Sequence, residues 1–181
     1  MRARPEDVRL VVADDLPAIR SILADEIRDG YAHFALEPPT LDELREELRR
    51  AAGRHPWVVA TGASEGVIGF ARCAPWKSRG AYRWTTEIGV YVDARHRGRG
   101  VGVALYTALF PLIEAHSLKS VLAGITLPNA ASVRLHERFG MVHVGTLPHV
   151  GFKHAAWRSV GYWHRFLGDP HTDVAAERQP G

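Results

Sequence analysis

The sequence predicts a mixed α/β (α+β) domain built around one central sheet. Three observations support this class: strand-like segments rich in β-branched and aromatic residues, helical segments with apolar residues at three- and four-residue spacing, and the interleaving of the two. The expected order is β-α-α-β-β-β-α-β-α-β-β. The 181 residues suffice for one hydrophobic core. We therefore expect a single domain over residues 1–167 and a flexible polar tail over residues 168–181.

The N-terminal part is expected to form one strand and two helices. Residues 8–12 (VRLVV) are typical of a strand, and residues 14–30 have the apolar spacing of a helix. A second helix is predicted over residues 41–53. Thr40 is a good N-cap for it, and Glu43 completes the pattern of a capping box.

The middle of the chain is expected to form an antiparallel meander of three strands, over residues 57–61, 66–75 and 82–92. An apolar helix over residues 101–113 follows, although Pro111 is expected to kink or interrupt its later turns. The remaining predicted elements are a strand over residues 120–126, a helix over 129–140 and closing strands over 141–152 and 159–167.

Composition excludes several classes of protein. No uncharged apolar run approaches the roughly 20 residues of a membrane helix, and the N-terminus lacks the pattern of a signal peptide. The single cysteine, Cys73, cannot form an internal disulfide, and the cytoplasm is the expected location. None of the ten histidines forms an H-x-x-x-H pair, so no metal site is expected. The formal charge of +3 permits nucleic-acid binding without requiring it.

A glycine- and arginine-rich junction separates the predicted strand 82–92 from the helix 101–113. A helix N-terminus preceded by glycines offers unpaired backbone N–H groups, and the helix dipole favours an anion there. Arg95, Arg97 and Arg99 add positive charge, so a phosphate or pyrophosphate is the expected ligand. The P-loop pattern fails because no Lys-Ser or Lys-Thr follows the glycines, and the dinucleotide pattern G-x-G-x-x-G fails as well.

The pattern that fits is Arg97-x-x-Gly100-x-Gly102 between a strand and an apolar helix. It resembles the coenzyme A pyrophosphate loop of the GNAT superfamily of N-acyltransferases. Four further stretches resemble the phosphinothricin N-acetyltransferase family within it: FALEPPT, APWKSRGAYRWTTEIGVYV, LPNAASVRLHERFGM and GFKHAAWRSVGYWHRFL. With the loop, the resemblance runs from about residue 34 to residue 167.

The resemblance implies a GNAT-type fold, a central, mostly antiparallel sheet of about seven strands flanked by about four helices and splayed where coenzyme A binds. It implies transfer of an acetyl group from acetyl-CoA to the primary amine of a small amino-acid-like substrate, by direct attack. It also implies a homodimer, in which the region of residues 154–164 helps to form the interface and shape the substrate cavity.

The resemblance places the general base at Glu87 and a proton-transfer role at His136. Glu87 is a carboxylate in an otherwise apolar strand, and burial would raise its pKa toward neutrality. The structural alternative for Glu87 is an exposed strand residue paired with Arg72 or Arg83. For His136 it is an ordinary surface or packed residue.

The resemblance also implies two sets of binding residues. Those for acetyl-CoA are Val90, Tyr91, Val92, Arg97, Gly98, Arg99, Gly100, Val101, Gly102, Asn129 and Ser132. Those for the acceptor are Phe34, Lys77, Arg79, Tyr82 and Gly89. The structural alternatives are a helix cap for Asn129 and a solvated loop for Lys77 and Arg79.

The chain departs from the family at two places near the expected acceptor. Ile88 and Gly89 follow Glu87 where the family has small or hydroxyl residues, and Gly30, Tyr31 and His33 precede the FALEP stretch. The acceptor therefore stays open between phosphinothricin, methionine sulfoximine or sulfone, another free amino acid and an unrelated primary amine.

Two other functions compete with this interpretation. One is a catalytically silent acyl-CoA sensor, and the other is a small nucleic-acid-binding domain that uses the arginine cluster. Cys73 is expected to be a packed thiol rather than a nucleophile, because its strand is apolar and offers no base.

Overall fold

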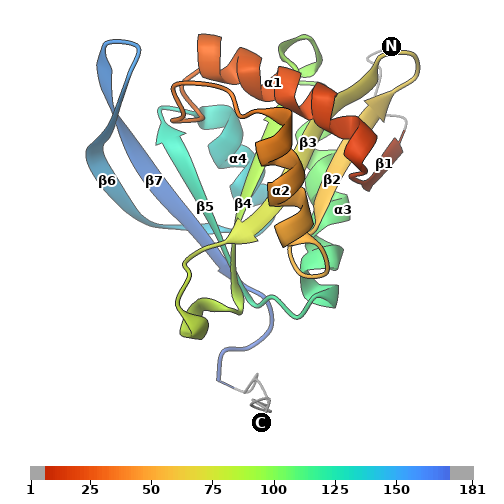
Figure 1. Ribbon diagram of the computed structural model, residues 1–181. Coiled ribbons are helices and arrows are strands. Elements are labelled where there is room, and N and C mark those ends of the chain that lie inside the picture. The colour runs from red at the N-terminus through yellow and green to blue at the C-terminus, as the bar shows by residue number, and fades with distance from the viewer. Residues whose placement is uncertain (1–6, 172–181) are drawn as a thin grey trace.

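A computed structural model describes residues 7–171, in which one seven-stranded sheet carries helices on both faces (Figure 1). The strands are β1 (Asp7–Leu10), β2 (Trp57–Gly62), β3 (Gly66–Pro75), β4 (Thr85–Val92), β5 (Ser120–Leu127), β6 (Val142–Lys153) and β7 (Ala156–Phe166). The helices are α1 (Leu16–Asp29), α2 (Leu41–Ala51), α3 (Val101–Ala115) and α4 (Ala130–Arg138). Short 3₁₀ turns cover Ala13–Asp15, Gly80–Tyr82 and Ala94–His96. The predicted fold class and the order of strands and helices are confirmed.

The sheet order is β1-β2-β3-β4-β5-β7-β6, and every neighbouring pair is antiparallel except β4 with β5. This parallel pair is joined only where residues 85–87 face residues 120–122. Beyond Glu87 the two strands diverge, and β5, β7 and β6 lean away from the rest of the sheet (Figure 1). The predicted antiparallel meander and the predicted splay are both present.

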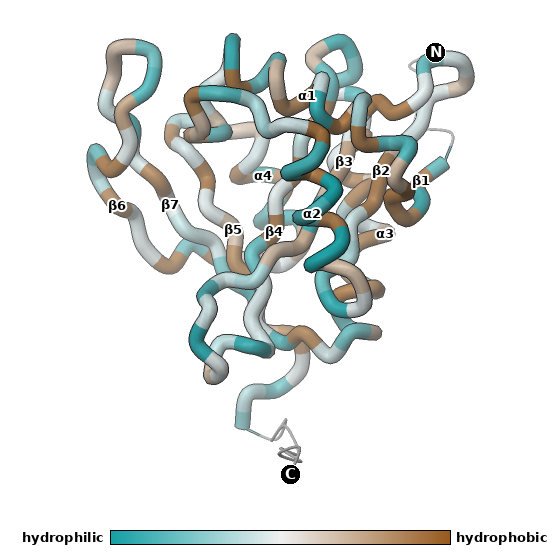
Figure 2. Tube along the Cα trace, in the orientation of Figure 1, coloured by the Kyte–Doolittle hydropathy of each residue, from teal (hydrophilic) through white to brown (hydrophobic). Residues whose placement is uncertain are grey.

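Two hydrophobic clusters hold the helices on opposite faces of the sheet. Residues of α1 and α2 pack with Phe70 and Val59, and residues of α3 pack with Val58 and Ala71. Figure 2 shows the hydrophobic residues along β2 and β3 and the many hydrophilic residues along α2. Because side chains alternate along a strand, successive residues of β4 serve the two faces in turn. Ile88 enters the α3 cluster, while Tyr91 packs against the α1 and α2 cluster.

Helix starts follow local chemistry. The Thr40 hydroxyl accepts the Glu43 N–H at 3.2 Å, and the Glu43 carboxylate accepts the Thr40 N–H at 2.7 Å, so the predicted capping box is confirmed. The first helix begins at Leu16, two residues later than predicted. Asp15 is buried there, accepts the Val12 N–H at 2.9 Å and pairs with Arg9 at 2.7 Å.

Several predicted boundaries are wrong. The strand predicted over residues 82–92 begins at Thr85, because residues 80–82 form a 3₁₀ turn. Pro111 does not interrupt α3, which continues to Ala115 on a fully buried stripe of leucine and isoleucine. Of the tail predicted over residues 168–181, residues 172–181 lie outside the described part of the chain. Within residues 7–171, every helix is too short or too polar to cross a membrane.

Candidate active site

A groove of about 570 Å³ opens where β4 and β5 diverge. Its walls come from the end of α1 and the loop after it, from β4, from the glycine-rich loop, from the end of β5 and from α4. The predicted acetyl-CoA residues that line it are Val90, Tyr91, Val92, Arg97, Gly98, Gly100, Val101, Gly102, Asn129 and Ser132. Arg99 is not among the lining residues, and its side chain is exposed.

One end of the groove is formed by the start of α3 and the glycine-rich loop before it. Gly98 and Gly100 have φ values of +71° and +83°, a left-handed conformation that favours glycine, and a Cβ at either would point into open space. Val101 and Gly102 supply the first backbone N–H groups of the helix and line the groove. The arrangement fits an anion such as a pyrophosphate.

The wall formed by β4 fits an extended ligand. One edge of β4 is bonded to β3 as far as Val92, whereas its other edge loses β5 after Glu87. Backbone groups on that free edge therefore face the groove and can pair with a ligand as with an added strand. Together with the phosphate-binding end, this geometry suits coenzyme A, whose pantetheine arm would lie along β4.

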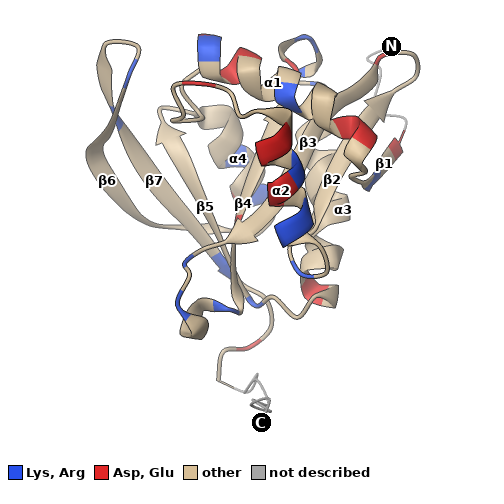
Figure 3. Ribbon diagram, viewed as in Figure 1, with Lys and Arg blue, Asp and Glu red and all other residues tan. Residues whose placement is uncertain are grey.

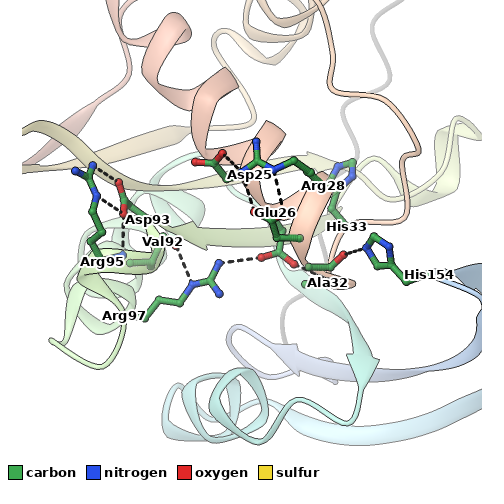
Figure 4. Close-up of polar contacts among 12 residues, drawn as sticks. Asp25, Glu26, Arg28, Ala32, His33, Val92, Asp93, Arg95, Arg97 and His154 are labelled. Carbon is green, nitrogen blue, oxygen red and sulfur yellow. Dashed lines mark hydrogen bonds and ion pairs between the residues drawn. The ribbon is translucent and has the colours of Figure 1, made fainter.

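An ion pair crosses the groove wall (Figure 4). The Arg97 guanidinium lies 2.9 Å from the Glu26 carboxylate and donates to the Val92 carbonyl at 3.1 Å. Glu26 also accepts the Ala32 N–H at 3.0 Å. The pair therefore ties the glycine-rich loop to the loop after α1. Arg95 points elsewhere, because its guanidinium is held by Asp93 at 2.7 Å.

Sequence reasoning missed Glu26. Its side chain is only 10% exposed, and it lies three residues after Leu23 and one before Ile27 on the buried side of α1. A charged residue within a buried helical stripe was the available signal. Tyr31 also lines the groove and donates its hydroxyl to the Pro128 carbonyl at 2.8 Å. The sequence marks Tyr31 only as a departure from the family.

Glu87 lies on the α1 and α2 face of β4, at the point where the strands part. Its Oε1 atom is 3.4 Å from the position that a Cβ on Gly124 would occupy, and Gly124 lines the groove. Burial raises the pKa of Glu87, and the positive charges of Lys77 and Arg72 partly offset that rise. Within residues 7–171 Glu87 has no ion-pair partner, and Arg72 bonds Glu47 instead. The geometry therefore favours a half-buried carboxylate that can take a proton.

His136 also lines the groove, but both of its ring nitrogens are engaged. Nδ1 lies 2.8 Å from the Ser132 carbonyl oxygen, which only accepts, so Nδ1 carries the proton in the neutral ring. Nε2 then accepts from the Tyr106 hydroxyl at 2.8 Å. Burial lowers the pKa of His136, which keeps this neutral form. The histidine consequently links α4 to α3, and it has no N–H left for a ligand in the groove.

The predicted acceptor residues are only partly brought together. Lys77 acts on Glu87 electrostatically, and its Nζ lies 4.7 Å from the ring centroid of Trp76. Gly89 lines the groove. Arg79 and Tyr82 are exposed at the 3₁₀ turn after β3 and lie outside the groove lining. The Phe34 ring packs against Gly151 of β6, also outside that lining.

Comparisons with known proteins agree with this geometry. Residues 16–141 match the family model described as Acetyltransferase (GNAT) family. The chain is 45% identical over 163 residues to a phosphinothricin N-acetyltransferase of Streptomyces viridochromogenes, covering 90% of this chain and 88% of that protein. It is 35% identical over 144 residues to an L-methionine sulfoximine/L-methionine sulfone acetyltransferase of Pseudomonas aeruginosa, covering 79% and 84%.

Among solved structures, a GNAT superfamily phosphinothricin acetyltransferase from Sinorhizobium meliloti in complex with AcCoA superimposes with a TM-score of 0.84. It is 31% identical and covers 93% of this chain and 90% of its own. A putative acetyltransferase from Salmonella typhimurium with its cofactor acetyl-CoA gives a TM-score of 0.87 at 28% identity, covering 94% and 98%.

Proposed function

The chain belongs to the acetyltransferase (GNAT) family and is an acetyl-CoA-dependent N-acetyltransferase, and we propose that it acetylates the primary amine of a small amino-acid-like molecule. The names of its relatives support acceptors such as phosphinothricin and methionine sulfoximine or sulfone. Family membership favours this enzyme over a silent acyl-CoA sensor and over a nucleic-acid-binding domain.

We propose Glu87 as the general base. Most amines are protonated at neutral pH, and an amine must lose a proton before it can attack a carbonyl carbon. The observation that carries this proposal is a carboxylate with a raised pKa whose Oε1 atom lies 3.4 Å from the position of a Cβ on Gly124; Gly124 lines the groove, and Glu87 stands just behind that lining. Bound acetyl-CoA would supply the activated acetyl thioester.

The residues proposed to hold acetyl-CoA have distinct tasks. The amides at the start of α3 suit the pyrophosphate, and the free edge of β4 suits the pantetheine arm. Asn129 caps α4 by accepting the Ser132 N–H at 3.1 Å, so its side-chain oxygen is already bonded to the helix. Arg97 would have to leave Glu26 to meet a phosphate.

For His136 we propose a positioning role in place of direct proton donation. The Ser132 and Tyr106 bonds fix the ring, and the Tyr106 side chain is fully buried. This pair supports the wall of the groove between α3 and α4.

The test is an acceptor panel followed by thiol release from acetyl-CoA. Free amino acids, phosphinothricin, methionine sulfoximine and methionine sulfone would be compared at equal concentration. We expect saturable thiol release with at least one amino-acid-like acceptor and acetylation of its amine by mass spectrometry. Turnover only with polyamines, peptides or nucleic acids would overturn the proposal.

We further propose a homodimer formed through β6 and β7. β6 is an edge strand, and exposed apolar side chains gather on this hairpin: Val142, Val144, Leu147, Val150, Phe152 and Trp157. The ring centroids of Phe152 and Trp157 lie 5.4 Å apart, and each side chain is more than half exposed. Lys and Arg are sparse on β5, β6 and β7 in Figure 3. Such a patch is typical of an interface.

Light scattering after size exclusion tests the dimer. The wild type should elute at twice the chain mass, and Trp157→Glu should shift it toward the monomer. A monomeric wild type at micromolar concentration would contradict the proposal.

We also propose a cytoplasmic location, which the buried free thiol of Cys73 and the need for acetyl-CoA support.

A further inference from the structure

Arg158 on β7 is a cation for which residues 7–171 provide no hydrogen-bond acceptor. Its Nε atom is buried without a hydrogen-bond partner, and within residues 7–171 the guanidinium forms no ion pair. Its one described contact is with the Tyr31 ring, whose centroid lies 4.6 Å from the guanidinium carbon. Buried polar groups nearly always have partners, so this site is short of one oxygen-bearing group.

The neighbouring basic side chains of the same hairpin are satisfied. The Lys153 ammonium donates to the His33 carbonyl at 2.7 Å, and His154 Nε2 bonds the Gly30 carbonyl at 2.8 Å. These two bonds clamp the loop after α1 onto the hairpin. Arg158 stands beside the same loop, yet it bonds none of that loop's carbonyls. Its free donors are therefore not needed to hold the loop.

Arg158 lies on the face of the sheet that carries Glu87. A Cβ on Gly124 would be 3.4 Å from Glu87 Oε1, 3.4 Å from Tyr162 and 3.5 Å from Val160. Residues 158, 160 and 162 share one face of β7, because side chains alternate along a strand. Arg158 is one step further along this row, about 7 Å beyond Val160. The Arg158 guanidinium lies over the Tyr31 ring, and Tyr31 lines the groove.

We propose that Arg158 binds an anionic group at the distal end of the acceptor, such as a side-chain carboxylate or phosphinate. The inference rests on the proposed function, in which the acceptor amine lies at Glu87. The positive charge of Lys77 acts on Glu87, so Lys77 is suited to the α-carboxylate. Arg158 lies farther from Glu87, at the end of the row of β7 residues 158, 160 and 162. Its planar guanidinium matches two oxygens of a distal anion. The Tyr31 ring holds the guanidinium in place.

The experiment compares acceptors that share an α-amino acid head and differ at the distal end. Phosphinothricin and glutamate carry a distal anion, whereas methionine sulfone carries a neutral sulfonyl group. Steady-state kinetics would be measured for the wild type, Arg158→Gln and Arg158→Lys. Arg45→Gln is the matched control, because it removes the same charge from an exposed residue of α2.

We expect Arg158→Gln to raise KM for the anionic acceptors about 10-fold or more, with kcat little changed. KM for methionine sulfone should change less than about threefold, and Arg158→Lys should recover part of the loss. An equal effect on all acceptors, or no effect on any, would overturn the assignment of Arg158. If the wild type acetylates no amino-acid-like acceptor at all, the proposed function fails instead.

Discussion

At the scale of single residues, the site depends on carboxylates whose surroundings differ. Burial raises the pKa of Glu87, while the guanidinium of Arg97 neutralises Glu26 across the groove wall. The first carboxylate is suited to proton transfer and the second to holding two loops together. The two carboxylates differ because Arg97 forms an ion pair with Glu26, whereas Lys77 and Arg72 act on Glu87 without bonding it.

Glu87→Gln should lower kcat by about 100-fold or more, because the amide keeps the shape of the side chain but cannot take a proton. The Kd for acetyl-CoA, measured by calorimetry, should stay within about twofold. Glu114→Gln, which replaces an exposed carboxylate of α3, is the matched control and should leave both quantities unchanged. A Glu87→Gln variant with wild-type kcat would exclude the general-base role.

The pH dependence of kcat/KM should report the same carboxylate. The proposed general base must be deprotonated to act, so the rate should fall on acidification as Glu87 gains a proton. Because burial raises its pKa, the fall should set in above the ordinary value of 4.5. A profile that stays flat down to that value would contradict this expectation.

Glu26→Gln should tighten acetyl-CoA binding severalfold. The substitution removes a negative charge from the groove and frees Arg97, while the amide oxygen can still accept the Ala32 N–H. The gain should shrink as salt is raised, because it is electrostatic. Calorimetry at two salt concentrations measures it, and weaker binding at low salt would show that Arg97 does not serve the coenzyme.

The sequence predicted some of these groups and not others. Cys73 was predicted to be a packed thiol, and it is buried, with a pKa raised to about 12 by that burial. The partner of Arg97 is 71 positions away in the chain, and nothing local to the glycine-rich loop points to it. The acceptor bond of His136 Nε2 likewise depends on the Tyr106 hydroxyl, which lies on another helix, whereas Ser132, which fixes the tautomer, is only four residues earlier in the chain.

At the scale of elements, the glycine-rich loop allows a matched test of backbone conformation. Gly100 and Gly66 both have positive φ and open space where a Cβ would lie, but only Gly100 lines the groove. Alanine at either position should cost roughly 1–2 kcal/mol of unfolding free energy. Only Gly100→Ala should also weaken acetyl-CoA binding, since the loop must shift to relieve the strain. Equal Kd values for the two variants would contradict the assigned anion site.

Elements fixed by local chemistry were predictable, and elements fixed by pairing were less so. The capping box at Thr40 and the glycines before α3 are local signals, and both helices begin where they indicate. The start of β4 depends on β3 and β5, so the aromatic residues before Thr85 misled the prediction. The splay of the sheet was expected from resemblance alone, and the residue at which β4 and β5 part was not predicted, because no residue pattern encodes it.

At the scale of the whole molecule, the sheet separates two tasks. The α3 and α4 side supplies the helix N-terminus and the wall that suit the coenzyme. The α1 and α2 side carries Glu87 and the β7 row that ends at Arg158. The gap between β4 and β5 connects the two sides, which is the arrangement that the proposed reaction of an acetyl group with an amine at Glu87 requires.

Global stability should fall as pH is lowered below about 6.5. Burial lowers the pKa of four histidines in the folded protein: His33, His55, His136 and His164. Between the ordinary histidine pKa of 6.5 and the lower pKa of each folded histidine, the unfolded chain binds more protons than the folded chain. The free energy of unfolding therefore decreases as pH is lowered through this range. The raised pKa of Glu87 acts in the opposite direction, but for one group only.

Urea denaturation at fixed protein concentration, at about pH 7.5 and about pH 5.5, measures this loss, which should be about 1 kcal/mol or more. His164→Gln should reduce the loss, because glutamine can keep the hydrogen bond with the Ser120 hydroxyl, 2.9 Å from His164 Nε2, without titrating. His143→Gln, at an exposed position of β6, is the matched control for the substitution itself. A wild type equally stable at both pH values would mean that these rings gain protons as readily in the folded protein as in the unfolded chain.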